Sequence, residues 1–396
     1  MLETIHIGMS GLLGYSRGLR VIANNTANMN TPGFKSSSLQ FSDLFYTGGN
    51  LAGGPASRRP EQRGFGLDTA GTAMSFAQGD LRKTGNDLDM AIDGQGLFVL
   101  RAADGSLSYT RAGQFEFDSQ GLLVNRGDGA KVMGLDAQGQ LMPVGFAGRT
   151  IHPGRATSRA SFSGNLSSTA AERTVSGIKV LDTAGGTHTL SLRLTNLGAT
   201  APGQWNVDVL DGSTLVGNGR IGFVDGKPQP GMSQLTFSYA PEGQAPMPLM
   251  LDFGTNVTSF AAGDLSTLGV ASQDGVGAGT LGAASFDATG TLVLRYSNGQ
   301  ELQGDRLALA RFDTPDAVGA KGSNQFEILD ERAWHTGTAG DGGFGSVRSG
   351  MLEISNVDLS REFSDLVVMQ RGYQASSQII STANEMIQQL FTMKGR

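Results

Sequence analysis

The most regular pattern of apolar residues lies at the C-terminal end of the chain. Alternating steps of four and three residues trace a heptad seam from residue 359 to residue 391, about 50 Å of helix at 1.5 Å per residue. The members of the seam are Leu359, Phe363, Leu366, Gln370, Tyr373, Ser377, Ile380, Asn384, Ile387 and Phe391. One half of the seam is apolar and the other is polar at its centre, which is typical of a helix whose register and partner are specified. Ser355 and Asp358 resemble a capping box and place the helix start near Val357.

The N-terminal segment carries a second helical pattern. Its apolar stripe consists of Ile5, Leu12, Tyr15, Leu19 and Ile22, and an adjoining stripe consists of Gly8, Gly11, Gly14 and Gly18. Each glycine costs a helix about 1 kcal/mol relative to alanine. We therefore expect a helix that is marginal alone and packs closely against another helix in an assembly. The alternative is an ordinary amphipathic helix docked on its own domain. The run Asn28 to Phe34 predicts that the helix ends there.

Between these ends, short alternations of apolar and polar residues are cut repeatedly by Gly, Asn and Asp. Asn298-Gly299 is a hairpin signal. The pattern Phe/Leu-Asp-x-x-Gly-x-Leu occurs at 117–123, 135–141 and 286–292, and we interpret it as hairpin turns in which Gly adopts positive φ. The middle of the chain is thus predicted to be mainly β, built as sandwiches or barrels.

Composition narrows the chemistry that is possible. Of 396 residues, 59 are Gly and none is Cys, which excludes disulfides, a thiolate nucleophile, Cys-type zinc sites and iron–sulfur clusters. The net charge of −6 argues against nucleic acid or an anionic membrane surface as a partner. No run approaches the roughly 20 apolar residues of a membrane span, so membrane insertion is not expected. The N-terminus also lacks the pattern of a cleaved secretory signal.

Searches for a catalytic or metal site give no candidate that we prefer. The four His residues are scattered, and two Gly-x-Gly-x-x-Gly matches do not open a predicted helix. Asp87, Asp89 and Asp93 are interpreted as solvated hairpin residues; Asp89 and Asp93 side by side in a pocket with a raised pKa would revive a glycosidase. We therefore expect that the chain is not an enzyme and that it has no catalytic residue, no bound cofactor and no metal site.

Four motifs together resemble the signatures of the bacterial flagellar rod and hook axial proteins. They lie at 23–35, 88–99, 109–115 and 355–375, and the resemblance covers roughly 1–145 and 285–396. Thr26 departs from the branched aliphatic residue that is usual in the family. The positions that match the terminal signatures are Asn24, Asn25, Ala27, Asn28, Thr31, Gly33, Phe34, Asn356, Val357 and Asp358.

This resemblance implies a mainly β fold with α-helical termini. The N- and C-terminal helices form a coiled-coil-like pair, and of two β-rich domains, barrel or sandwich, the outer is inserted into the inner. The expected parts are a terminal helical domain at 1–30 and 357–396, a connecting segment at 31–70, an inner β domain at 71–145 and 285–356, and an outer β domain at 146–284. Rod members are typically shorter, so the insertion favours the hook members of the family.

The resemblance also implies a function. Hook subunits polymerise into a curved hollow tube that acts as a universal joint and transmits torque from rod to filament. Implied partners are further copies of the chain, the rod, hook cap and hook–filament junction proteins, and the flagellar type III export apparatus. The implied location is the hook and basal body of the flagellum, outside the cell after export without a cleaved signal. We assign the N-terminal apolar stripe and the ten seam residues to the assembly interface. A distal rod protein and a secreted β-rich binding module stay as alternatives.

The weak helix propensity of the ends leads to a first prediction. Residues 1–30 and 357–396 are expected to be largely disordered in the monomer and to become helical on assembly. Circular dichroism of the full-length monomer, compared with a variant lacking both ends, measures their helix content. Full helix in the ends before polymerisation would contradict the prediction.

Overall fold

The computed structural model describes residues 2–44, 46–47 and 63–394, which form two compact units. Unit 1 comprises 1–147, 284–293 and 303–396, and unit 2 comprises 148–283 and 294–302. The chain thus leaves unit 1 and returns to it. Within the described residues, no helix is long and apolar enough to cross a membrane.

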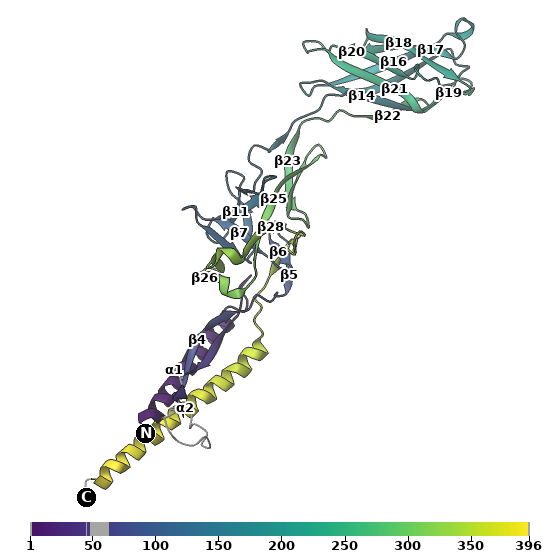
Figure 1. Cartoon of the computed structure of the whole chain (residues 1–396). Coiled ribbons are helices and arrows are strands. Elements are labelled where there is room, and N and C mark those ends of the chain that lie inside the picture. Colours follow the sequence, from purple (N-terminus) through teal and green to yellow (C-terminus); the bar gives the residue numbers. More distant parts are fainter. Residues whose placement is uncertain (1, 45, 48–62, 395–396) are drawn as a thin grey trace, which may run out of the picture. The chain divides into compact units, whose positions relative to one another are not determined.

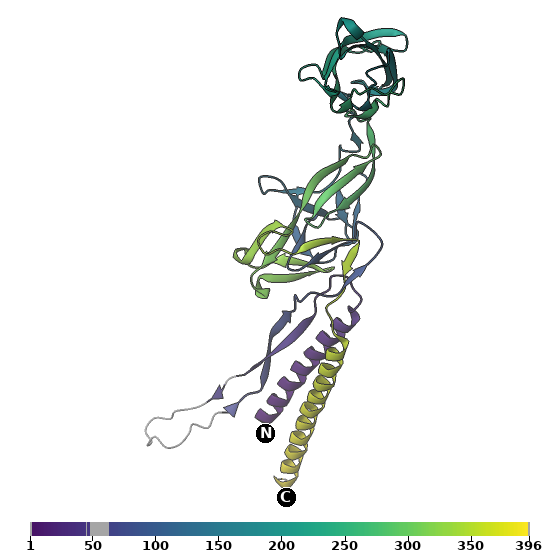
Figure 2. The same ribbon diagram turned by 90° about the vertical axis from the view of Figure 1, so that its right-hand side faces the viewer.

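The two ends of the chain form a helix pair in unit 1. Helix α1 (Leu2–Ala27) packs along α2 (Leu359–Lys394), and the two lie side by side in both views (Figures 1 and 2). The pair is antiparallel, since Gly8 lies against Ile380 whereas Gly18 lies against Met369. The predicted pairing of the terminal helices is therefore confirmed.

A two-stranded antiparallel hairpin covers another side of α1. It is made of β1 (Ser37–Asp43) and β4 (Leu67–Met74), and the short strands β2 (Tyr46–Thr47) and β3 (Arg63–Gly64) pair farther along it. Strands β1, β2 and β3 and the first half of β4 fall in the segment 31–70 that we expected to connect the helices to the β domain. Residues 45 and 48–62 of that segment lie outside the described residues.

The glycine stripe of α1 lies against other parts of the same chain. A Cβ atom on Gly8 would lie 2.8 Å from Ile380 Cγ1, and one on Gly18 would lie 2.8 Å from Met369 Sδ. Gly14 faces the hairpin instead, where a Cβ would lie 2.4 Å from Leu67 Cδ1. Close packing on glycine is thus present as expected, but α2 and the hairpin of the same chain provide it. Packing of α1 against other copies of the chain stays a prediction.

The β strands of unit 1 form a branched sheet around one apolar core. The strand order is β25-β11-β7-β8-β27-β26, with β12 and β28 paired to β11 and β25, and with β9 paired to β10. The core includes Leu97, Tyr109 and Met133. The strands are β5 (Leu81–Lys83), β6 (Met90–Asp93), β7 (Leu97–Arg101), β8 (Leu107–Thr110), β9 (Phe115–Phe117), β10 (Leu123–Asn125), β11 (Lys131–Leu135), β12 (Leu141–Pro143), β26 (Val318–Gly322), β27 (Gln325–Ile328), β28 (Trp334–Thr338), β29 (Ser346–Ser349) and β30 (Met351–Glu353). Two further strands, β24 (Thr291–Tyr296) and β25 (Glu301–Phe312), have residues in both units.

Smaller pairs tie the last strands to early ones. Strand β29 pairs with β6, and β30 pairs with β5, both antiparallel. Two short 3₁₀ turns, η2 (Pro315–Ala317) and η3 (Glu331–Ala333), follow β25 and β27. Through these pairs the segment that leads into α2 is fixed to the first strands of the β domain.

The three Asp-x-x-Gly patterns form hairpin turns, as predicted. Asp118 Oδ1 accepts from the amides of Gln120 and Leu122, and Asp136 and Asp287 make the same two bonds in their own turns. The glycine of each turn has φ between 72° and 78°. An unpredicted fourth copy lies at Asp182, where Thr187 replaces the final Leu. The aspartates therefore close turns through backbone amides.

Unit 2 is a β barrel made of two sheets. One sheet has the order β15-β16-β17-β18-β19 and the other β20-β21-β14-β22, and Figure 2 looks along the unit so that its strands form a ring. Trp205, Phe162 and Phe253 fill the core, and the rings of Phe162 and Phe253 stack at 4.6 Å. The elements are β13 (Ile151–His152), β14 (Arg159–Asn165), β15 (Glu172–Leu181), β16 (Thr187–Asn196), η1 (Gly198–Thr200), β17 (Gln204–Asp211), β18 (Thr214–Val224), β19 (Lys227–Pro228), β20 (Gln234–Tyr239), β21 (Met247–Thr258), β22 (Gly269–Gln273) and β23 (Gly279–Phe286).

Candidate functional site: the paired terminal helices and their junction

The apolar stripe predicted on α1 is covered within the single chain. Ile22 is buried, and Ile5, Leu12, Tyr15 and Leu19 are half-buried. The Tyr15 ring lies over Gly372 of α2, where a Cβ would come within 2.5 Å of it, and also contacts Phe41 of β1. These side chains hold the helix pair and the hairpin together. Their assignment to contacts between subunits stays a prediction.

The buried residues of α2 coincide only partly with the predicted seam. One half of the seam agrees with the prediction, whereas in the other half the buried residue precedes the predicted one. In the apolar half, Leu359, Leu366, Ile380 and Ile387 are half-buried, and Tyr373 is 40% exposed. In the other half, all five residues are exposed, namely Phe363, Gln370, Ser377, Asn384 and Phe391. The buried positions there are Glu362, Ser376 and Ala383, each one residue earlier.

The shift has a physical reason. A heptad pattern marks an apolar line along a helix but does not say which flank of that line meets the partner. The glycines of α1 bring the two backbones close, so the small residues Ser376 and Ala383 face α1. The larger Phe363 is left on the exposed flank, at 58% exposure.

A second apolar stripe on α2 is exposed along the helix. Its members recur at the spacings of 11, 7, 4 and 3 residues that keep them on one face. Their exposures lie between 43% and 78%. The stripe consists of Val368, Ile379, Met386, Leu390 and Met393. Within the described residues of this chain nothing buries this exposed stripe, and exposed apolar patches on this scale mark interaction surfaces.

Asn25, a signature residue, joins three elements at the base of the helix pair. Its Nδ2 donates to Glu362 Oε1 at 2.9 Å and to the carbonyl of Ser37 at 2.7 Å, and its Oδ1 accepts from the Ser37 amide. The side chain is buried. One amide group therefore positions the start of β1 and the first turn of α2 against the last turns of α1.

The other N-terminal signature residues shape the turn that ends α1. Asn28 Nδ2 donates to the carbonyl of Asn24, and Thr31 Oγ1 donates to Asn28 Oδ1. Gly33 has φ +71°, and a Cβ there would lie 2.4 Å from the Ala112 amide nitrogen, so only glycine fits. The unusual Thr26 donates its hydroxyl to the carbonyl of Ile22 within the helix. Ala27 is exposed, and Phe34 is half-buried beside Gly33.

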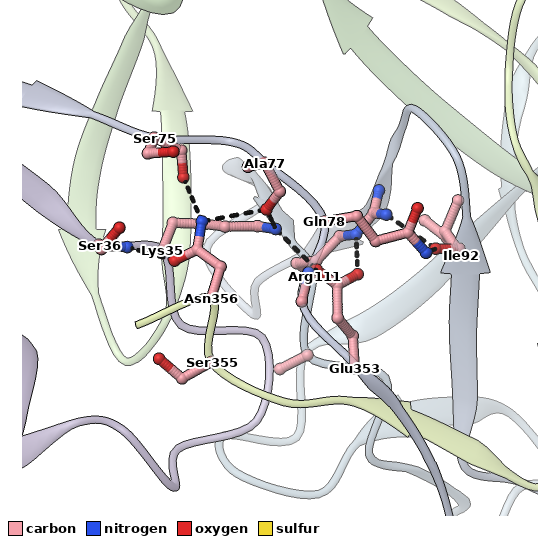
Figure 3. A network of polar contacts seen from close by, with 12 residues as sticks. Lys35, Ser36, Ser75, Ala77, Gln78, Ile92, Arg111, Glu353, Ser355 and Asn356 are labelled. Carbon is pink, nitrogen blue, oxygen red and sulfur yellow. Dashed lines mark hydrogen bonds and ion pairs between the residues drawn. The ribbon is translucent and has the colours of Figure 1, made fainter. Parts of the chain in front are cut away.

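Asn356, in the C-terminal signature, also joins separate segments of the chain through its side-chain amide. Its Oδ1 accepts from the Ser36 amide at 2.8 Å, and its Nδ2 donates to the carbonyls of Ser75 and Ala77. Figure 3 shows this residue bridging the segment before β1 and the segment after β4. The two signatures, more than 300 positions apart, therefore meet in one junction.

The capping of α2 differs from the prediction. The helix begins at Leu359 rather than near Val357, and Asp358 is its cap, because Asp358 Oδ1 accepts from the amides of Ser360 and Arg361. Ser355 instead accepts from the Val357 amide and turns the chain before the cap. Helix α1 ends at Ala27, directly before the run Asn28 to Phe34 that predicted its end.

A buried ion cluster lies next to this junction (Figure 3). Glu353, at the end of β30, accepts from Lys35 Nζ at 2.7 Å, from Arg111 Nε and from the Gly79 amide at 2.9 Å. All three charged side chains are at most 5% exposed. Burial lowers the pKa of Lys35, and the charge of Glu353 opposes that shift. Since one carboxylate serves two cations, the cluster ties the segment after α1, the end of β8 and the approach to α2 together.

Sequence reasoning missed this ion cluster although its signal was present. Lys35 and Arg111 lie inside the motifs that carried the family resemblance, and each is the one charged residue of its motif at 23–35 or 109–115. Glu353 stands two residues before the C-terminal signature. A charged residue inside an otherwise uncharged motif is a candidate buried ion, and pairing these three was possible in principle.

The acidic residues considered as a catalytic pair have separate partners. Asp89 lies 3.5 Å from Arg126 Nη2, and Asp93 lies 3.0 Å from Arg348 Nη2. Asp93 is half-buried, and Asp89 is buried, so the interpretation of Asp89 as a solvated residue is wrong. Among the described residues no group of His, Asp and Glu is arranged to hold a metal ion.

Glu353→Gln tests the ion cluster. The variant leaves two buried cations without an opposite charge, and we expect the free energy of unfolding to fall by about 3–5 kcal/mol. Urea denaturation measures the change. The matched control is Glu116→Gln, which breaks a largely exposed pair with Arg126 and is expected to change the free energy by less than about 1 kcal/mol. Equal effects of the two variants would contradict the role given to Glu353.

Glu362→Gln tests the contact between the helices. Burial raises the pKa of Glu362, with Asp365 and Asp358 adding to the shift and Asn25 and Arg361 opposing it. A raised pKa favours the folded state at low pH: the contribution is complete below the ordinary value of 4.5 and is lost as pH rises through the raised pKa.

The glutamine keeps the acceptor for Asn25 but cannot ionise, so the variant is expected to be more stable than the wild type at neutral pH and to lose the advantage near pH 4. Denaturation curves of the assembled proteins, in which the helix pair is formed, are followed by helix signal at several pH values and measure the difference between the two proteins. Glu385→Gln, at an exposed site of α2, is the control. A difference that stays constant with pH would contradict the assignment.

Comparisons with known proteins match the chain in three places. The profile described as "Flagella basal body rod protein" matches residues 5–35, "Flagellar hook protein FlgE/F/G D1 domain" matches 91–161, and "Flagellar basal body rod FlgEFG protein C-terminal" matches 348–393. The first and last of these contain the helix pair and the junction described above.

Similar proteins align over nearly the whole chain. The flagellar hook protein FlgE of Borreliella burgdorferi is 29% identical over 100% of both chains, and that of Escherichia coli is 29% identical over 98% of both. The flagellar basal-body rod protein FlgG of Bacillus subtilis is 26% identical, also over 100% of both. The crystal structure of the Helicobacter pylori flagellar hook protein FlgE2 matches with a TM-score of 0.50 and 14% identity, covers 69% of this chain and 100% of that chain, and supports the fold.

The terminal signatures, the helix pair that they join and the full-length alignments agree with one another. The chain is therefore similar to the bacterial flagellar rod and hook axial proteins at both termini, in its first β domain and over nearly its full length.

Proposed function

We propose that this chain is the structural subunit of a flagellar hook and polymerises into a helical tube through its terminal helices. The observation that carries the proposal is the exposed apolar stripe of α2, from Val368 to Met393. The helix already buries one face against α1, so the stripe offers a second face for other copies of the chain. A contact between two different surfaces does not close on itself and continues as a helical filament.

The distribution of residue types around α2 supports the same function. Opposite to the apolar faces runs a polar arc that includes Arg371, Gln378 and Gln389, all exposed. A helix that is apolar on two flanks and polar on the third suits a wall that contacts neighbours on its sides and water on one face. We therefore propose that the polar arc lines the channel of the tube.

We also propose a role for the β domains. Residues 71–145 and 285–356 would form the inner β domain, and residues 146–284 would form the outer β domain. The separate core of unit 2, centred on Trp205, supports this division. Assembled tubes of this kind would transmit torque as a universal joint between rod and filament, in contact with rod, cap and junction proteins.

The proposal includes the route out of the cell. Export through the flagellar type III apparatus without a cleaved signal is supported by a chain that has no cysteine to form disulfides on the way. The glycines of α1 lower its helix stability, so the helix depends on packing partners. This property suits a chain that passes through the export channel before it folds.

A distal rod protein is the second candidate. The alignment with the rod protein of Bacillus subtilis over the full length of both chains supports this second candidate. Electron microscopy of the purified, polymerised protein separates the two, because a hook protein is expected to form curved tubes and a rod protein straight ones.

Leu390→Lys tests the exposed stripe. Leu390 is 52% exposed, so the variant is expected to keep the fold of the monomer but to lose polymerisation, since the charge would be buried against the next copy. Sedimentation and electron microscopy measure tube formation, and circular dichroism checks the fold. Gln389→Lys places the same charge on the polar arc and is the matched control. Wild-type assembly of Leu390→Lys, or equal loss in both variants, would overturn the proposed interface.

The apolar half of the seam gives a companion test. Leu366→Asp and Ile380→Asp are expected to leave the β domains folded and to abolish assembly, because the charge falls between α1 and α2. Tubes formed by either variant would contradict the need for a docked helix pair.

A further inference from the structure

A cavity of about 390 Å³ lies in unit 1 beside the buried ion cluster. It is open on one side and is lined by the segments after α1 and after β4, the turn between β6 and β7, the end of β8 and the end of β25. Three cationic side chains line it, Lys35, Arg111 and Arg311, together with the carboxylate of Asp313.

The cationic side chains around the cavity have more N–H donors than the hydrogen-bond acceptors that they contact. Lys35 Nζ has three N–H donors, of which two go to Glu353 and to the carbonyl of Ala77. Arg111 has five, of which four go to Glu353 and to the carbonyls of Ile92, Gly94 and Gly96. One donor of each side chain is left without an acceptor among the described residues.

Arg311 has the clearest unmet hydrogen bond. Its Nε is buried and has no partner among the described residues. Asp313 does not neutralise it well, since the nearest oxygen lies 3.9 Å from Nη1 and the other oxygen is 3.0 Å from His335 Nε2. The three cations thus have two carboxylate partners, since Glu353 pairs with Lys35 and Arg111 from outside the cavity lining and Asp313 lies near Arg311, which leaves one positive charge in excess.

The remaining lining is mainly apolar, with two amide side chains, those of Gln78 and Gln95. Phe76, Leu97 and Phe312 line the same cavity, and the rings of Phe76 and Phe312 meet edge to face at 4.5 Å. A few convergent polar groups in a largely apolar concavity are the usual features of a small-molecule site. The volume leaves room for more than a bare inorganic ion.

We propose that this cavity binds one carboxylate group attached to an apolar body. The carboxylate accepts the spare donors of Arg311, Arg111 and Lys35 and balances the excess charge, while the apolar body packs on Phe76 and Phe312. The same chemistry is offered by a free organic acid and by an acidic side chain with its apolar neighbour from a second copy of the chain.

Calorimetric titration of the full-length monomer tests the proposal with benzoate as the probe. We expect one site per chain, with benzamide, the neutral analogue of the same shape, and acetate, which lacks the apolar body, each weaker by about tenfold or more. Equal binding of benzoate and benzamide would overturn the charge requirement. Phosphate or acetate binding as tightly as benzoate would overturn the apolar requirement.

Variants locate the site. Arg311→Leu is expected to weaken benzoate binding by about tenfold or more, because it removes both the charge and Nε. Arg311→Lys keeps the charge and is expected to fall between Arg311→Leu and the wild type. Arg332→Gln, at an exposed residue that does not line the cavity, is the control and should bind as the wild type. Unchanged binding in both Arg311 variants, with the fold verified by circular dichroism, would overturn the assignment.

Polymerised protein separates the two sources of the carboxylate. If a second copy supplies the group, saturating benzoate slows assembly of the wild type and the finished polymer no longer binds benzoate. If the group belongs to a free organic acid, assembly is unaffected and the polymer binds one benzoate per chain. Absence of benzoate binding in both monomer and polymer would overturn the proposal.

Discussion

The dependence of α1 on its neighbours is the constraint around which the rest of unit 1 is arranged. Four glycines lower the intrinsic stability of the helix by about 1 kcal/mol each, and the same glycines let Ile380, Ser376 and Met369 of α2 approach closely. A helix of this kind is stable only where another surface fits it. The sequence of α2, the hairpin that covers Gly14 and the junction below both helices all provide that surface.

The junction converts the helix pair into a fixed extension of the β domain. Asn25 and Asn356 use their amide groups to join segments far apart in the chain, and Glu353 holds Lys35 and Arg111 in a buried cluster. These contacts are costly to break because each leaves a buried polar group or charge without its partner. The signature residues of the family are therefore explained mainly by how they connect the termini, and the apolar stripe of α2 is left free for assembly.

Several features followed from local sequence alone. The Asp-x-x-Gly turns closed as predicted because their bonds join an aspartate to amides two and four residues later, so no distant residue is needed. The helical termini were also predicted correctly, since their periodicity extends over many turns. The start of α2 was misplaced by two residues because Ser355 and Asp358 are both good caps, and the hydrogen bonds of the folded chain decided between them.

The sequence by itself determined the elements: two amphipathic ends, a β-rich middle with glycine turns, and a family resemblance carried by short motifs. Only the tertiary structure decided which flank of α2 meets α1, that Lys35, Arg111 and Glu353 share one site, and that a charged cavity lies beside them. The physical reason is the separation along the sequence of the residues that must meet. Turns and helices are set by contacts within a few residues, whereas Glu353 and Lys35 are 318 positions apart and meet only after the strands and helices have packed.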